Sequence, residues 1–280
     1  MEITATPLAL AKFIDPTKNG EAEDNTEIAL RLSIAERVQR CTRQKENLLK
    51  AIELLQDVPT EERHNLDNPE SGCLFIEQKA WRELVEATGI ASAMSVKSRE
   101  KLNSQLYETT RHNAQTSLPP FTEANVFGFL DQTYRDMPQM IQDAVAEIFD
   151  WLRPSSRHYK TNDEFMIGDK VILSWLVESN YSRGFRVSYR RAAHVDALGN
   201  VLSMLDGKGV TKHPHTLSNK INTAWAASDT YSDEYLIAKG FKNNNAHIRF
   251  LRPDLIAKIN QSAGPLWLRR ESQQSRGFSH

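Results

Sequence analysis

The stretch Tyr235-Leu-Ile-Ala-Lys-Gly-Phe-Lys-Asn-Asn-Asn-Ala-His-Ile-Arg-Phe-Leu251 decides the fold class of the second half of the chain. Apolar side chains recur at alternate positions on both sides of Lys242-Asn-Asn-Asn245, which is typical of half-buried strands. Asparagine favours tight turns because its side chain bonds to nearby backbone groups. The stretch therefore predicts an antiparallel pair of strands, Tyr235–Phe241 and Ala246–Leu251.

Further strands are predicted upstream of this pair. Phe165–Leu173, centred on Gly168-Asp169, predicts a hairpin of two short strands because a Gly-Asp pair suits a two-residue turn. Phe185–Tyr189 predicts a strand with one apolar and one basic face. The apolar face would carry Phe185, Val187 and Tyr189, and the basic face Arg186, Ser188 and Arg190.

Helical patterns separate and follow these strands. Residues 192–205 and 217–225 repeat apolar positions every three or four residues. Pro253 suits the first position of a helix that ends before Gly264. We therefore predict a basic α+β domain at residues 154–270, with a small, mainly antiparallel sheet and flanking helices.

The first half of the chain predicts helices alone. Residues 1–25 lack periodicity and predict a flexible arm, residues 26–153 a helical domain, and residues 271–280 a polar tail. The expected helix signals include a capping box from Ser33 to Glu36 in a helix that begins there or is already under way from Thr26. The others are a C-cap at Gly89, an N-cap at Thr122 and a kink or interruption at Pro138.

Residues 34–55 place apolar side chains at alternating steps of four and three, interrupted by Lys45. One interpretation is a long helix that packs on a neighbouring helix of its own chain, and the shortness of the stripe favours it. The other is a coiled coil in which Lys45 sets the register, which predicts a homodimer through this helix. The stripe consists of Ile34, Val38, Cys41, Leu48, Ile52 and Leu55.

Composition predicts a folded protein without a membrane partner. Apolar residues make up 40% of the 280 residues, and no apolar stretch is long enough for a signal peptide or a spanning helix. We expect the chain to be cytoplasmic. Cys41 and Cys73 lack the spacing of a zinc or redox pair and are interpreted as small buried residues.

Charge is distributed unevenly along the chain. Residues 1–150 contain 16 Lys and Arg against 25 Asp and Glu, whereas residues 151–280 contain 19 against 11. A basic half favours an anionic partner such as nucleic acid. The alternative is that the two halves attract each other or that the charges are merely solvated.

No strong catalytic motif is present, and no cofactor or metal is expected. His213-Pro-His215 is interpreted as a chance pair rather than a metal site. In the last predicted strand, His247 and Arg249 would share the surface opposite to the core-facing Ile248 and Phe250. His247 could bind phosphate or, with Asp196 as a carboxylate partner, act as an acid or base; the alternative is that it only bonds backbone.

The loop Arg157-His-Tyr-Lys-Thr-Asn162 interleaves cations with an aromatic ring, a combination that suits single-stranded nucleic acid, although a solvated connection is the alternative. The residues predicted to contact nucleic acid are Tyr159, Lys160, Lys170, Arg186, Arg190, Lys242, Asn244, His247 and Arg249.

Short motifs along the second half carry a family resemblance. They are Trp151-Leu152, Tyr159-Lys-Thr-Asn162, Lys170-Val-Ile-Leu173, Asp206-Gly207, Phe241-Lys-Asn-Asn-Asn-Ala-His-Ile-Arg-Phe250, Arg252-Pro-Asp-Leu255 and Asn260. In these motifs the chain resembles the bacterial and phage family known as domain of unknown function 4942. The helical part of the chain from about Ser33 is also similar to the usual N-terminal region of that family. The resemblance implies a phage, plasmid or integrative-element setting and no particular activity.

Three hypotheses follow. The first is an accessory protein of a phage or mobile element that binds nucleic acid through its basic half. The second is an anti-defence protein, for example against restriction, or a defence-related one, that contacts a host or phage protein complex through its acidic helices. The third is an enzyme that processes nucleic acid or nucleotides with His247.

Overall fold

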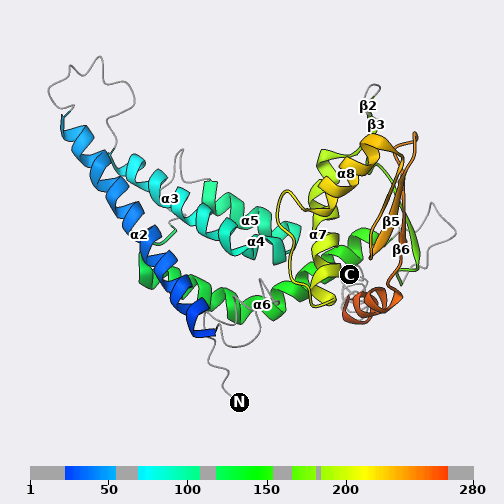
Figure 1. The fold of residues 1–280 in the computed structure, drawn as a ribbon, viewed down its shortest axis with the longest axis horizontal. Helices are drawn as coiled ribbons and strands as arrows, with labels where there is room; N and C mark the ends of the chain where they lie inside the picture. The colour runs from blue at the N-terminus through cyan, green and yellow to red at the C-terminus, as the bar shows by residue number, and fades with distance from the viewer. Residues whose placement is uncertain (1–22, 55–68, 108–117, 154–165, 181–183, 264–280) are drawn as a thin grey trace, which may run out of the picture. The chain divides into compact units, whose positions relative to one another are not determined.

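The computed structural model describes residues 23–54, 69–107, 118–153, 166–180 and 184–263, and it divides the chain into two compact units (Figure 1). Unit 1 comprises Met1–Ala91 and Ser98–Met137, and unit 2 comprises Ser92–Lys97 and Pro138–His280. The domain limits predicted above were placed where helical patterns give way to strand patterns. The two units are instead groups of residues that contact one another in the folded chain.

Helices alone form the described part of unit 1, as predicted. None of the described helices is long and apolar enough to cross a membrane. The helices of the first half are α2 (Glu23–Leu54), α3 (Pro69–Thr88), α4 (Ile90–Ala93), α5 (Val96–Tyr107) and α6 (Glu123–Leu152), of which α4, α5 and α6 also contribute residues to unit 2.

Two of the predicted caps are confirmed. Gly89 has a φ of 71°, and its N–H reaches the carbonyl oxygens of Val85 and Glu86 at 3.2 Å, which ends α3. The Thr122 hydroxyl accepts the N–H of Asn125 at 3.3 Å and begins α6.

The other two helix signals have a different outcome. Ser33 lies inside α2, so the helix is already under way and the capping box does not form an end. Helix α6 continues through Pro138, so the interruption is wrong, whereas the kink stays a prediction. The boundary between the two units nevertheless falls between Met137 and Pro138.

The apolar stripe of α2 packs on α3 of the same chain. Cys41 is buried, and Lys45 forms an ion pair with Glu77 of α3. Gly72 allows a close approach of the two helices, because a Cβ atom there would lie 2.5 Å from the Leu48 side chain. These contacts agree with a hairpin of helices within one chain, and the homodimer stays a prediction.

Trp81 is the centre of the core in unit 1. Its side chain is 2% exposed and meets Phe121 and Phe129 edge to face, with ring centroids 5.2 and 5.3 Å apart. The indole N–H donates to the carbonyl oxygen of Pro119 at 3.0 Å. One side chain thus joins α3 to the beginning of α6.

Unit 2 contains a four-stranded antiparallel sheet in the order β1-β6-β5-β4 and a separate pair, β2-β3. The predicted pairing of the last two strands is confirmed, with Gly240 opposite Ala246. The strands are β1 (Lys170–Leu173), β2 (Val177–Asn180), β3 (Gly184–Val187), β4 (Thr230–Ser232), β5 (Leu236–Gly240) and β6 (Ala246–Phe250).

The predicted hairpin around Gly168-Asp169 is wrong. Only Lys170–Leu173 is a strand, and its partner is β6 rather than the residues before Gly168. The Asn260 side chain takes the place of a strand partner for Ile167, because it accepts the Ile167 N–H at 2.9 Å and donates to the Ile167 carbonyl at 3.0 Å. The Gly168-Asp169 pair therefore does not form the predicted hairpin turn, and Ile167 is bonded instead to Asn260, 93 positions away.

The strand predicted at Phe185–Tyr189 is shorter than expected. Strand β3 ends at Val187, and helix α7 (Tyr189–Leu205) begins two residues later. The carbonyl of Ser188 accepts the N–H groups of Arg191 and Ala192 at 2.9 Å, which starts the helix. Tyr189 and Arg190 therefore belong to the helix and not to the strand. The predicted apolar and basic faces of the strand extend only to Val187.

The helices predicted to flank the sheet are present (Figure 1). They are α7, α8 (Leu217–Ala227) and a C-terminal helix at residues 253–263, which Pro253 begins. Trp225 of α8 is 1% exposed and donates its indole N–H to the carbonyl of Ala238 in β5 at 3.2 Å. The inner face of the sheet, with Ile248 and Phe250 as predicted, is thereby buried in the core of unit 2.

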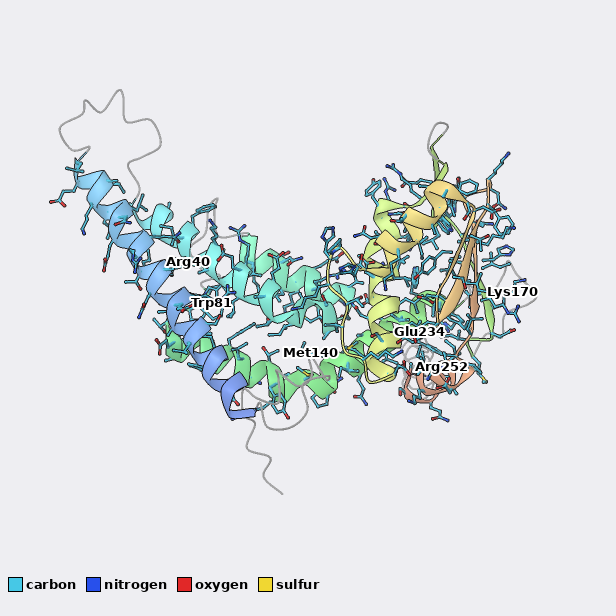
Figure 2. The ribbon with its side chains drawn as sticks, in the orientation of Figure 1. Arg40, Trp81, Met140, Lys170, Glu234 and Arg252 are labelled. Carbon is cyan, nitrogen blue, oxygen red and sulfur yellow. The ribbon has the colours of Figure 1, made fainter. Side chains whose placement is uncertain are left out.

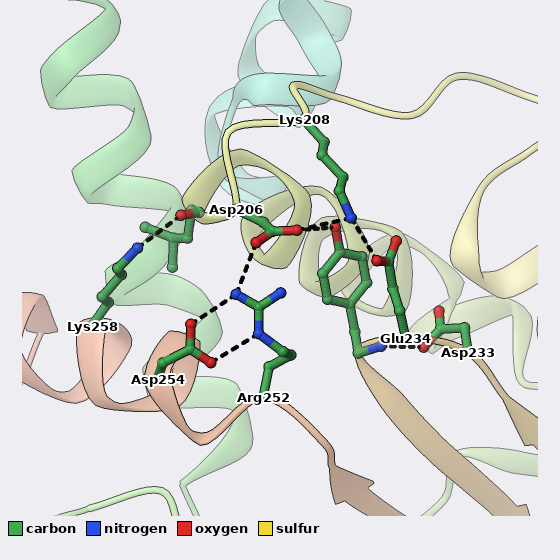
Figure 3. A network of polar contacts seen from close by, with 9 residues as sticks. Asp206, Lys208, Asp233, Glu234, Arg252, Asp254 and Lys258 are labelled. Atoms are coloured by element: carbon green, nitrogen blue, oxygen red, sulfur yellow. Dashed lines mark hydrogen bonds and ion pairs between the residues drawn. The ribbon is translucent and has the colours of Figure 1, made fainter.

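A polar network joins the end of α7 to the segment before the C-terminal helix (Figure 3). Arg252 contacts the carboxylates of Asp206 and Asp254 at 2.8 Å, and Lys208 contacts Asp206 at 2.9 Å. The Lys208 ammonium and the Arg252 guanidinium hold the pKa of the Asp206 carboxyl well below its ordinary value. These two cations are therefore already neutralised within the fold.

Candidate nucleic-acid interface

The strand register gathers basic side chains on the outer face of the four-stranded sheet. Lys170 lies opposite Arg249, and His247 lies between Ile172 of β1 and Lys239 of β5. Opposite residues in an antiparallel pair point to the same side, so these side chains share one face. Figure 2 shows Lys170 on the side of the sheet away from α7 and α8.

No carboxylate shares this face among the described strand residues. Lys239 contacts Asp229, which precedes β4, at 3.4 Å. Within the described ranges, Lys170 and Arg249 have no ion-pair partner, and both are exposed. The outward positions of the four strands are Lys170, Ile172, Thr230, Ser232, Ile237, Lys239, His247 and Arg249.

His247 is less cationic than its neighbours. Its ring packs against Phe241 with centroids 4.3 Å apart. Burial and the nearby Lys170 lower the pKa of His247 from its ordinary value of 6.5, because both disfavour the charged imidazole. At neutral pH the imidazole is therefore mainly uncharged, and the cations beside it are Lys170, Lys239 and Arg249.

Asp196 has a structural role in this fold. Its carboxylate accepts the N–H of Ser218 at 2.8 Å and so caps the beginning of α8, where the Thr216 side chain makes no capping bond. In the described part of the chain, no hydrogen bond joins Asp196 to His247. The geometry gives the acid–base pair no support.

The turn between β5 and β6 carries Lys242 and Asn244. Lys242 is exposed, whereas Asn244 has a φ of 66° and its N–H donates to the carbonyl of Phe241 at 3.1 Å. The Asn244 carbonyl in turn accepts the N–H of Val177, at 3.1 Å. Asn244 thus fixes the turn against β2.

An open groove lies beside this turn, between the β2-β3 pair and the beginning of α7. Its volume is about 800 Å³, and Asn244 and Ser188 contribute to its wall. Two exposed aromatic rings line the groove together with charged side chains. These residues are Trp175, Glu178, Arg186, Tyr189, Arg190 and Arg191.

Charges in the groove are mostly positive. Arg186 donates from Nε and Nη2 to the Glu178 carboxylate at 2.9 and 2.6 Å. The Ser188 hydroxyl and this guanidinium lower the pKa of Glu178, so the carboxylate stays charged and paired. Among the described residues of the groove, Arg190 and Arg191 have no counter-ion.

A comparison with known families matches residues 75–266 to the model described as Domain of unknown function (DUF4942). The chain belongs to the DUF4942 family. No curated protein and no solved structure matches the chain. The predicted resemblance is thereby confirmed for the region that contains the sheet and the groove. The similarity that was predicted for the helical part from Ser33 to residue 74 lies outside the matched residues.

The structure brings together only part of the interface predicted for this DUF4942 protein. Lys170, His247 and Arg249 share the sheet face, and Lys242 and Asn244 lie in the adjacent turn. Arg186 and Arg190 belong to the groove instead. Tyr159 and Lys160 lie outside the described residues.

Sequence reasoning missed Trp175, Lys239 and Arg191. Lys239 could have been found, because it alternates with buried residues in the strand that the opening stretch predicts. Trp175 gave no signal, since it stands in a turn that was not expected between two strands. The described residues contain no group of three or more His, Cys, Asp or Glu that could hold a metal, and this includes His213 and His215.

Proposed function

We propose that unit 2 of this protein binds nucleic acid, with the outer face of the four-stranded sheet against the phosphates. The observation that carries the proposal is the convergence of Lys170, Lys239 and Arg249 on one face whose described strand positions carry no carboxylate. Only Lys239 has a carboxylate partner there, Asp229 before β4. Lysine and arginine on a surface favour phosphate oxygens, and such contacts read no sequence. The expected binding is therefore general rather than sequence-specific.

We further propose that the protein is an accessory protein of a phage or mobile element and acts in the cytoplasm. Membership of the DUF4942 family supports this setting only by association. A protein that binds phosphates without reading bases could coat, guide or protect the element's nucleic acid.

The test is fluorescence anisotropy of labelled single-stranded and double-stranded DNA and RNA, over a salt series from about 50 to about 200 mM. Binding should weaken steeply with salt. Arg249→Ala should weaken binding to every sequence and reduce the log–log salt slope by about 0.9 for duplex DNA and about 0.7 for a single strand, the values for one lost phosphate contact.

Lys220→Ala is the matched control for Arg249→Ala. Lys220 is an exposed cation on α8, which packs against the other side of the sheet. The control removes the same net charge but leaves the outer face intact, so its salt slope should equal that of the unmodified protein. Equal effects of the two substitutions, or no binding at low salt, would refute the proposal.

A second candidate function is a protein contact through unit 1. The observation behind it is a set of exposed apolar side chains on α2 and α3, where Leu32, Leu54 and Phe75 are 58%, 80% and 51% exposed. The partner would be a host or phage protein complex of a defence pathway. A partner that is captured after nuclease treatment and is lost with Phe75→Glu would support this function.

A further inference from the structure

Trp175 is a large aromatic residue at a turn position where its side chain is not buried. The residue lies in the Ser174–Trp175 turn between β1 and β2 with a φ of 59°, in the left-handed region that Gly and Asn favour. Its side chain is 70% exposed, so burial of the indole contributes too little free energy to offset the unfavourable backbone conformation. Residues held in such conformations concentrate at binding sites.

Tyr189 presents a second ring to the same groove. It is 71% exposed at the first position of α7. The Arg190 guanidinium lies 5.6 Å from the ring centroid, and its Nε donates to the Tyr189 hydroxyl at 2.9 Å. Arg190 therefore restrains the ring and places a positive charge beside it.

Hydrogen bonds hold the segments next to both rings. The N–H of Ser188 donates to the carbonyl of Leu176 at 2.8 Å, and the N–H of Val187 donates to the Asn222 side chain at 2.7 Å. The groove wall is thus tied both to the turn that carries Trp175 and to α8. A ligand would meet preformed surfaces rather than order them on binding.

We propose that this groove holds unpaired bases of a single-stranded nucleic acid, stacked on Trp175 and Tyr189, with Arg190 and Arg191 beside the phosphates. This inference rests on the proposed function and specifies single-stranded nucleic acid as the ligand. Aromatic rings combined with cations are the usual means of binding single strands, because every base offers a π face. A duplex keeps its base faces stacked and cannot use the rings.

The location of the groove allows one strand to reach both surfaces. Asn244 lines the groove, and the turn that contains it carries Lys242 and leads directly into β6 with His247 and Arg249. A volume of about 800 Å³ gives room for at least one nucleotide. Bases in the groove would therefore leave their neighbouring phosphates near the basic sheet face.

The test compares a thymidine oligonucleotide, an abasic strand of the same length and a duplex, each titrated by anisotropy against the full chain. Trp175→Ala should weaken binding of the thymidine strand about 5- to 150-fold, the loss expected for one stacked base, and leave the duplex and the abasic strand within about twofold. Trp175→Phe should retain most of the affinity for the thymidine strand because the ring remains.

Phe75→Ala is the control, since it removes an exposed aromatic ring from unit 1. It should leave binding of all three ligands unchanged. The inference is overturned if Trp175→Ala weakens the abasic strand and the thymidine strand equally, or weakens neither while the unmodified protein binds both. A protein that binds none of the three ligands overturns the proposed function as well, so the two failures are distinguishable.

Discussion

The outer sheet face and the groove are both basic, but they differ in what they can recognise. The sheet face presents Lys170, Lys239 and Arg249 from regular strands, with aliphatic side chains between them. The groove presents two exposed rings, Trp175 and Tyr189, on irregular backbone and a helix end. Cations alone detect phosphate, whereas rings beside cations also detect the faces of bases.

Net charge alone therefore does not locate the proposed interface. Lys208 and Arg252 add to the basic total of the second half, yet Asp206, Glu234 and Asp254 neutralise them. On the sheet face, Lys170 and Arg249 have no carboxylate partner among the described residues, whereas Lys239 contacts Asp229.

The largest effect is expected from a core substitution that destabilises the sheet face and the groove together. Trp225→Ala should lower the free energy of unfolding by about 3–5 kcal/mol, because it opens a cavity at a side chain that is 1% exposed behind both sheets. Chemical denaturation measures the loss. Binding of single strands and duplexes should fall in parallel.

Trp81→Ala is the counterpart in unit 1, where the side chain is 2% exposed. It should lower the stability of unit 1 by a similar amount while unit 2 keeps its affinity for nucleic acid. Loss of binding with Trp81→Ala at temperatures where unit 2 stays folded would show that the surfaces of unit 2 are not sufficient.

The next effect separates the two surfaces by their salt dependence. Lys170→Ala combined with Arg249→Ala should reduce the log–log salt slope by about 1.8 for duplex DNA, because two phosphate contacts are lost. Arg190→Ala combined with Arg191→Ala should leave the duplex slope unchanged and reduce that of a single strand. Identical behaviour of the two double variants on both ligands would mean that the surfaces form one undivided patch.

Regular elements with alternating burial were predictable from the sequence. In β6, Ala246, Ile248 and Phe250 are buried between His247 and Arg249, so the pattern itself places the basic side chains outward. The pairing of β5 with β6 followed from the short turn between them. The α+β class and the helical first half needed no long-range information.

Pairings between distant residues could not be predicted. The partner of β1 is β6, far along the chain, and no local signal distinguishes this from a hairpin around Gly168. The groove depends on the same pairing, because Trp175 becomes a turn residue only when β1 ends at Leu173. Its left-handed backbone is a consequence of that turn rather than of the tryptophan.

A smaller effect concerns the charge of His247. Its pKa lies below the ordinary 6.5, so the imidazole is neutral at pH 7 and gains a proton as the pH falls. A phosphate on the sheet face would favour the charged form and raise that pKa. Affinity should therefore increase about two- to fivefold between about pH 7.5 and about pH 5.5, the value of one exposed ion pair.

His247→Gln should abolish this pH dependence, as measured by anisotropy at constant ionic strength. Lys170, Lys239 and Arg249 keep their charges over the same interval. An unchanged pH dependence in His247→Gln would assign the proton to another group and remove His247 from the interface.

The smallest effect tests whether the backbone at Trp175 is held for function. Asparagine tolerates a φ of 59° better than tryptophan, and the exposed indole contributes little burial. Trp175→Asn should therefore raise the free energy of unfolding by about 0.5–1 kcal/mol while it weakens single-strand binding. Denaturation and anisotropy on the same preparation measure both. If the variant is less stable, the indole packs against the fold and its presence needs no ligand; if it is more stable but binds single strands fully, the groove does not hold the bases.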